Sequence, residues 1–159
     1  MSEARPPPSE AQADSVLIEA ESSFEAGLID GARGLYREAS YLFTRLVEIA
    51  PDEARLGLYL AKASYCDFMV AYCEALALKE NIDKTIMRGG SADPRDVSKL
   101  KLLVRLADKC LKEAVLRLEK LRGQTGEEEA KKRMDELIKM IGKKVEGFVD
   151  FRDEVEVLI

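Results

Sequence analysis

The chain contains three cysteines and no histidine. Without histidine, the nucleophile–histidine pairs of common hydrolases and the histidine-containing zinc sites are excluded. Cys66, Cys73 and Cys110 also lack the C-x-x-C spacing of zinc and redox motifs. Gly89-Gly90 has neither the lysine nor the spacing of a phosphate-binding loop. We therefore expect no cofactor and no metal, and among enzymes only carboxylate or lysine chemistry remains.

A row of basic side chains is the one charged pattern that could bind a ligand. At 100° per residue these side chains fall within about 80° of one another on a helix, so they could follow a phosphate backbone. Two carboxylates, Asp108 and Glu119, lie on the same side, and no aromatic residue is interleaved to stack on bases. An ordinary solvated helix face and contact with phosphate or an acidic partner are both retained. The row consists of Lys101, Arg105, Lys109 and Lys112.

The elements that carry these residues belong to a chain of 159 residues, of which 47% are hydrophobic and 35% are charged. Such a composition is typical of one well-packed helical domain rather than of a disordered chain. The net charge of −5 argues against a dedicated nucleic-acid binder, although residues 95–122 carry nine basic and four acidic side chains. We predict a flexible tail over residues 1–12, where three consecutive prolines occur, and a single helical domain over 13–159.

The N-terminus has no apolar core and does not resemble a secretory signal, so we expect a reducing, cytoplasmic setting with unpaired thiols. Residues 56–78 are apolar over a length that could cross a bilayer, but Lys62, Asp67 and Glu74 interrupt them. A helix that is apolar on nearly every side is better explained as the central, buried helix of a bundle. We therefore predict no membrane contact.

Hydrophobic periodicity predicts five helices and no strand. The first two are expected over residues 14–30 and 35–50, with a turn at Gly31–Gly34, because paired glycines favour tight turns. Pro51 ends the second helix, and the long apolar third helix is expected over residues 52–80. Short connections of this kind place successive helices antiparallel to one another.

The fourth helix is expected over residues 94–122, because Asp93-Pro94 combines a capping acceptor with a proline at the first helical position. Leu102 and Leu106 lie off its main apolar stripe, so we expect this helix to touch two neighbours. The fifth helix follows a glycine-containing turn and runs almost to the C-terminus. Thr125 and Glu128 have the spacing of a capping box at its start.

The predicted N-terminal hairpin carries a short family signature. A small residue, an aromatic residue four positions later and a proline eight positions beyond that stand at Ala39, Phe43 and Pro51, after Gly34 and Tyr36 at the expected turn. Residues 20–51 thus resemble a single degenerate tetratricopeptide repeat. The resemblance implies that the small residue lets two helices approach, the phenylalanine fills the gap and the proline stops the second helix. The pattern does not recur 34 residues later, so we do not expect a repeat array.

The same segment resembles, more weakly, the microtubule-interacting-and-trafficking domain. The shared pattern is an aspartate before the turn, followed by glycine, tyrosine, a glutamate–alanine pair and an aromatic residue. Both families bind partner helices or extended peptides in grooves between helices, whereas the same signature also arises from packing in any tight helical hairpin. The residues concerned are Asp30, Gly34, Tyr36, Glu38, Ala39 and Phe43.

These observations predict an all-α, five-helix bundle with a tetratricopeptide-like N-terminal hairpin. The expected function is that of a non-catalytic interaction module, an adaptor or scaffold that binds a partner protein or self-associates through a helical groove. The alternative is a small helical subunit of a nucleoprotein complex that contacts nucleic acid through the basic fourth helix. An enzyme is the least expected of the three, because no acid is paired with a base.

Overall fold

The computed structural model describes residues 8–124, 126 and 128–158, which form five α helices and contain no strand. The predicted all-α, five-helix bundle is thereby confirmed for the part of the chain that is described. The helices are α1 (Glu10–Glu25), α2 (Ile29–Glu48), α3 (Glu53–Met87), α4 (Pro94–Gln124) and α5 (Glu128–Glu156).

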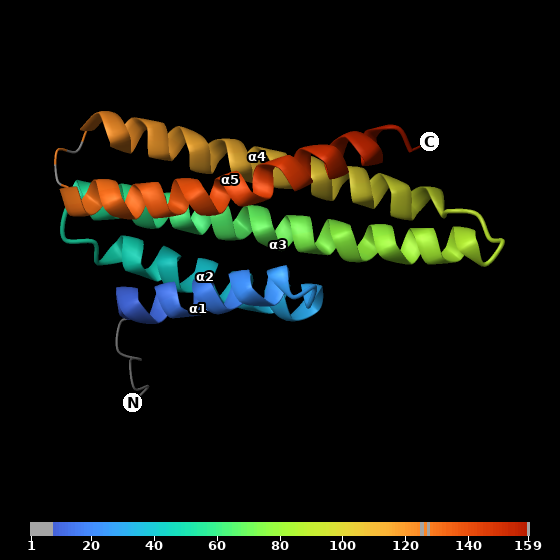
Figure 1. The fold of residues 1–159 in the computed structure, drawn as a ribbon, viewed down its shortest axis with the longest axis horizontal. Helices are drawn as coiled ribbons and strands as arrows, with labels where there is room; N and C mark the ends of the chain where they lie inside the picture. The colour runs from blue at the N-terminus through green and yellow to red at the C-terminus, as the bar shows by residue number, and fades with distance from the viewer. Residues whose placement is uncertain (1–7, 125, 127, 159) are drawn as a thin grey trace.

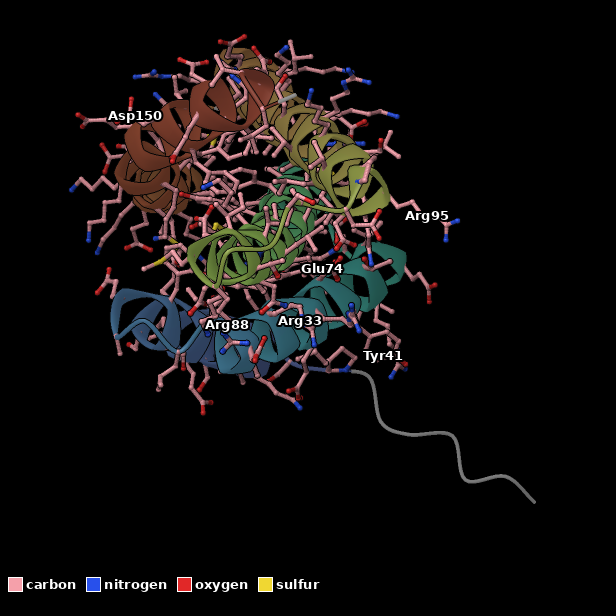
Figure 2. All side chains as sticks on the ribbon, turned by 90° about the vertical axis from the view of Figure 1, so that its right-hand side faces the viewer. Arg33, Tyr41, Glu74, Arg88, Arg95 and Asp150 are labelled. Carbon is pink, nitrogen blue, oxygen red and sulfur yellow. The ribbon has the colours of Figure 1, made fainter. Side chains whose placement is uncertain are left out.

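Helix α3 forms the centre of the bundle, and the other helices pack around it in two layers (Figure 1). The α1–α2 hairpin covers one side of the N-terminal half of α3, and the α4–α5 hairpin covers the opposite side. Seen end-on, α3 lies between the two hairpins, with α4 and α5 above it and α1 and α2 below (Figure 2). Because α3 is covered on both sides, it must be apolar on most of its circumference.

Helix α3 is the central, buried helix that residues 56–78 predicted, and it continues beyond them to Met87. It begins where the side chain of Asp52 accepts a hydrogen bond from the backbone N–H of Arg55 at 2.8 Å. Its aromatic residues contact α5. The ring of Phe148 packs edge-on against that of Phe68, with the two ring centres 5.0 Å apart. Among the described residues, every helix falls short of the combined length and apolarity that crossing a membrane requires.

The turn between α1 and α2 lies earlier than predicted. Gly27 makes this turn with a φ of +80°, a conformation that suits glycine because it has no Cβ. The turn predicted at Gly31–Gly34 is wrong, since both glycines lie inside α2 with exposed backbones. Glycine lowers the intrinsic stability of a helix, but packing of its neighbours Ala32 and Tyr36 into the core holds α2 together.

The N-terminal helix also begins earlier than predicted. The side chain of Ser9 accepts a hydrogen bond from the backbone N–H of Gln12 at 3.0 Å, and α1 begins at Glu10. Residues 10–12, assigned to a flexible tail from the sequence, therefore belong to a capped helix. Residues 1–7 of that predicted tail lie outside the described part of the chain, as does Thr125 of the predicted capping box.

Candidate functional site

Helix α4 presents one face to the core and the opposite face to solvent. As predicted, it begins at Pro94, where the side chain of Asp93 accepts a hydrogen bond from the backbone N–H of Arg95 at 2.9 Å. Its apolar face packs on α3 and α5. The opposite face is turned away from the bundle, as the outward-pointing Arg95 shows (Figure 2). Among the described side chains of α4, the buried ones are Val97, Leu100, Val104, Ala107, Leu111, Ala114, Leu118 and Leu121.

The predicted basic row lies on the solvent side of α4. Arg105, Lys109 and Lys112 are exposed, and Lys101 is half-buried. The periodicity of a continuous helix from Pro94 to Gln124 is what aligns them. The geometry expected from the sequence therefore holds, but alignment alone does not create a positive surface.

Acidic side chains interrupt the basic row. One carboxylate oxygen of Asp108 forms an ion pair with Lys112 Nζ at 2.8 Å, and the other accepts a hydrogen bond from Arg152 of α5 at 3.3 Å. Lys101 and Arg105 line a shallow groove of about 270 Å³ beside Glu156 at the end of α5. The row is therefore a surface of mixed charge, which weakens its attraction for a phosphate backbone.

An exposed apolar stripe runs along α4 beside the basic row. Leu102, Leu106 and Leu116 are 62%, 50% and 64% exposed, respectively. The sequence suggested that Leu102 and Leu106 would contact a second neighbouring helix. Helix α4 does contact both α3 and α5, but these two leucines lie in solvent and take no part in the core. These leucines therefore form an apolar strip on α4 that the bundle itself does not cover.

We refer to this surface as the outer face of α4. Its residues follow one another at intervals of four, three, four, three and four positions, which places all of them within about 80° of one another on the helix. Within the described residues, Lys109 and Glu113 form no ion pair, so both charges stand free on this face. The outer face consists of Leu102, Leu106, Lys109, Glu113, Leu116 and Lys120, all of which are exposed.

Three of the five residues of the predicted hairpin signature belong to the core. Tyr36, Ala39 and Phe43 are fully buried. Gly34 is exposed inside α2, so the prediction that it lies at the turn is wrong, and Pro51 is exposed in the connection between α2 and α3. The signature therefore reflects how α2 packs on its neighbours and how its C-terminal end is delimited.

A buried polar cluster joins four helices around Glu21, which sequence reasoning missed. The carboxylate of Glu21 in α1 accepts hydrogen bonds from the hydroxyl of Tyr36 in α2 and, at 2.8 Å, from that of Tyr65 in α3. Lys144 of α5 lies 3.1 Å from the same carboxylate and is only 5% exposed. Its ammonium group also lies 5.4 Å from the centre of the Phe24 ring. Every polar group of the cluster is thus paired.

Lys144 could have been recognised from its position in the sequence. It stands at the helical spacing of Leu137, Ile141 and Phe148, so a lysine interrupts an otherwise apolar face of α5. A lysine on such a face requires a buried partner, because an unpaired charge in the core is costly. The sequence does not show which carboxylate supplies it, since Glu21 lies on a distant part of the chain.

A groove of about 450 Å³ separates α1 from α5. Four of its five charged side chains are paired with one another, because Lys62 donates to Asp14 at 2.7 Å and Arg133 pairs with Glu10. The arginine and a hydrogen bond from Tyr59 lower the pKa of Glu10 even though burial raises it. The charges of this groove serve to attach α1 to α3 and α5.

The thiols are poorly suited to nucleophilic chemistry. Burial raises the pKa of Cys73 to about 12 and that of half-buried Cys110 to about 11. Cys66 is fully buried, and its pKa is raised as well. These side chains stay protonated at neutral pH. Within the described residues, no group of three or more cysteine, aspartate or glutamate side chains is placed to hold a metal ion.

No family model, curated protein or solved structure matches the chain.

Proposed function

We propose that this protein is a non-catalytic interaction module, an adaptor or scaffold, which binds a partner helix through the outer face of α4. The observation that carries this proposal is the stripe of Leu102, Leu106 and Leu116, each at least half exposed on one side of a single helix. Exposed leucines at helical spacing are the form of surface that packs against another amphipathic helix. Burying them would remove apolar area from water, which favours association.

Other features support a non-catalytic role. The buried charges of Glu21 and Lys144 satisfy each other, and most of the charged side chains in the groove between α1 and α5 are paired with one another. The thiols have raised pKa values. A catalytic site would instead be expected to hold a titratable group poised for proton transfer or attack within a cavity.

We also propose that α1, α2 and α3 form a tetratricopeptide-like unit. Support comes from fully buried Ala39 and Phe43, whose ring centre lies 6.4 Å from that of Tyr59 on α3. The turn at Gly27, rather than at Gly34, departs from the residues on which the family resemblance rests. The role of this unit in the proposal is to support α3, while α4 supplies the contact surface.

The alternative, a subunit of a nucleoprotein complex, has weaker support. It relies on Lys101, Arg105, Lys109 and Lys112, and the charge of Lys112 is partly neutralised by Asp108 at 2.8 Å. The other three cations form no ion pair within the described residues, but Asp108 and Glu119 lie on the same side of the helix and reduce the positive field that counterion release requires. We therefore favour a protein helix over nucleic acid as the ligand of α4.

The test replaces the three exposed leucines of the outer face together by glutamate. We expect self-association, measured by light scattering, or capture of a partner from an extract of the native organism, to be lost while the circular dichroism spectrum stays helical. Leu28→Glu is the matched control, because Leu28 is 63% exposed at the α1–α2 turn, away from α4. If both associations survive the triple substitution, the proposed function is wrong.

A further inference from the structure

We infer that the outer face of α4 binds a second copy of this chain, with the two α4 helices antiparallel. This inference rests on the proposed function and names the partner of the same surface. The residues of the outer face follow one another at alternating intervals of four and three positions. That alternation is the heptad spacing of a two-helix seam, in which residues from both helices meet layer by layer.

The outer face is complementary to itself when a second copy is turned end for end. Consider an antiparallel pair whose two-fold axis lies at the level of residue 111, although Leu111 itself faces the core. Leu106 of one copy then meets Leu116 of the other, and Lys109 meets Glu113. The two-fold axis repeats each of these contacts. Both charges are exposed and form no ion pair within the described residues, so they are available to pair across the seam.

Other arrangements of the same two helices lose this complementarity. A parallel pair would place Lys109 against Lys109 and Glu113 against Glu113, which are like-charge contacts. An antiparallel pair centred on residue 109 or on residue 113 would likewise bring one of these residues against its own copy. Only the antiparallel pair centred on Leu111 joins leucine with leucine and lysine with glutamate.

The basic row gains a role at the edge of this seam. Arg105, Lys112 and Glu119 recur every seven residues along one side of the outer face. In the antiparallel pair, Arg105 of one copy lies beside Glu119 of the other. Lys112 lies near its own copy across the axis, but Asp108 holds its ammonium group at 2.8 Å and offsets that repulsion. Leu102 at the end of the seam meets the aliphatic stem of Lys120.

Charged residues at two of the central seam positions fix the register and weaken the pair. A single helix–helix seam also lies at the small end of stable interfaces. We therefore expect a reversible dimer whose dissociation constant is on the order of micromolar rather than nanomolar.

The test uses charge reversal across the seam, with the molar mass measured by sedimentation or light scattering at up to about 0.1 mM protein. We expect the wild type to dimerise, Lys109→Glu alone to weaken dimerisation at least about tenfold, and Glu113→Lys alone to do the same. An equimolar mixture of these two variants should form a heterodimer, because every lysine then meets a glutamate. The doubly exchanged protein, K109E with E113K, should again form a homodimer.

Lys139→Glu is the control, since Lys139 is an exposed lysine on α5 outside the outer face, and it should dimerise like the wild type. A wild type that dimerises while the mixture of single variants stays monomeric would show that the register is wrong and overturn the inference. A monomeric wild type at the highest concentration would overturn it as well. If capture of another protein by wild-type α4 were then abolished by the triple leucine substitution, the proposed function would stand without the self-partner.

Discussion

Lys144 of α5 and Glu21 of α1 form an ion pair at 3.1 Å across the interior of the bundle, with side chains that are 5% and 13% exposed. This pair connects the first helix with the last, and the hydroxyl groups of Tyr36 and Tyr65 complete the coordination of the carboxylate. Burying a charge costs free energy, so the two side chains are tolerated in the interior only because each compensates the charge of the other.

We predict that removing one member of this pair destabilises the protein strongly. Lys144→Ala leaves the Glu21 carboxylate without its cation and should lower the free energy of unfolding by about 3 kcal/mol. The double variant E21Q with K144M keeps the shapes of the side chains but removes both charges, and it should recover part of that loss. Urea unfolding measures both variants. A double variant that is less stable than Lys144→Ala would contradict this account.

Two glycines of the α1–α2 hairpin should respond to alanine in opposite directions. Gly27→Ala places a Cβ on a residue with φ of +80° and should lower the free energy of unfolding by about 1 kcal/mol or more. Gly34→Ala lies inside α2 with nothing within 4 Å of the added Cβ, so it should raise that free energy by about 0.5 to 1 kcal/mol. Urea denaturation of the two variants side by side is the measurement. If both substitutions changed the free energy of unfolding in the same direction and by the same amount, the turn would not lie at Gly27.

Stability should fall at alkaline pH. Burial raises the pKa of Cys73 to about 12 and that of Cys110 to about 11, and it raises the pKa of Tyr36 and Tyr65 as well. The unfolded chain releases these protons at about pH 8.5 for cysteine and about pH 10 for tyrosine, while the fold retains them. The stabilisation is complete below the unfolded pKa and is lost as pH rises towards the folded one. Each group contributes a decrease of up to about 1.4 kcal/mol per pH unit in that window.

Urea unfolding between about pH 8 and pH 11 tests this pH dependence. The variant Cys73→Ala lacks one of the titrating thiols, so its free energy of unfolding should decline less steeply than that of the wild type. A wild type whose stability does not change across this range would show that the thiols and tyrosines titrate alike in both states.

The basic row should bind nucleic acid weakly. Because Lys112 is paired with Asp108, we expect elution from an immobilised DNA duplex at low salt, with little change when Lys101, Arg105 and Lys109 are all reversed to glutamate. The measurement is the salt concentration at elution for both proteins. Strong retention by the wild type that disappears in the triple variant would favour the nucleoprotein alternative instead.

Features that reside within one helix could be predicted from the sequence. Asp93-Pro94 marked the start of α4, the apolar run at residues 56–78 marked the central helix, and 100° periodicity aligned the basic row. The off-stripe position of Leu102 and Leu106 was also visible. Their exposure was not, because periodicity places a residue on a face without showing whether another helix covers that face.

Features that depend on contacts between distant parts of the chain could not be predicted. Three glycines stood within eight residues, and local preference for turns did not distinguish Gly27 from Gly31 and Gly34. The turn falls at Gly27 because a helix that begins at Ile29 places Ala32 and Tyr36 in the core. The partner of Lys144 was likewise hidden, since Glu21 is joined to it only by the packing of α1 beside α5.

The two glycines inside α2 have a consequence for how the bundle opens. A helix with Gly31 and Gly34 in its first two turns has little tendency to form alone, so its backbone hydrogen bonds persist only while α2 is docked on α3. Amide hydrogen exchange in α2 should therefore be faster than in α3 and report local detachment of the N-terminal hairpin. The slowest-exchanging amides should lie in the middle of α3, where they become exposed only when the whole bundle unfolds.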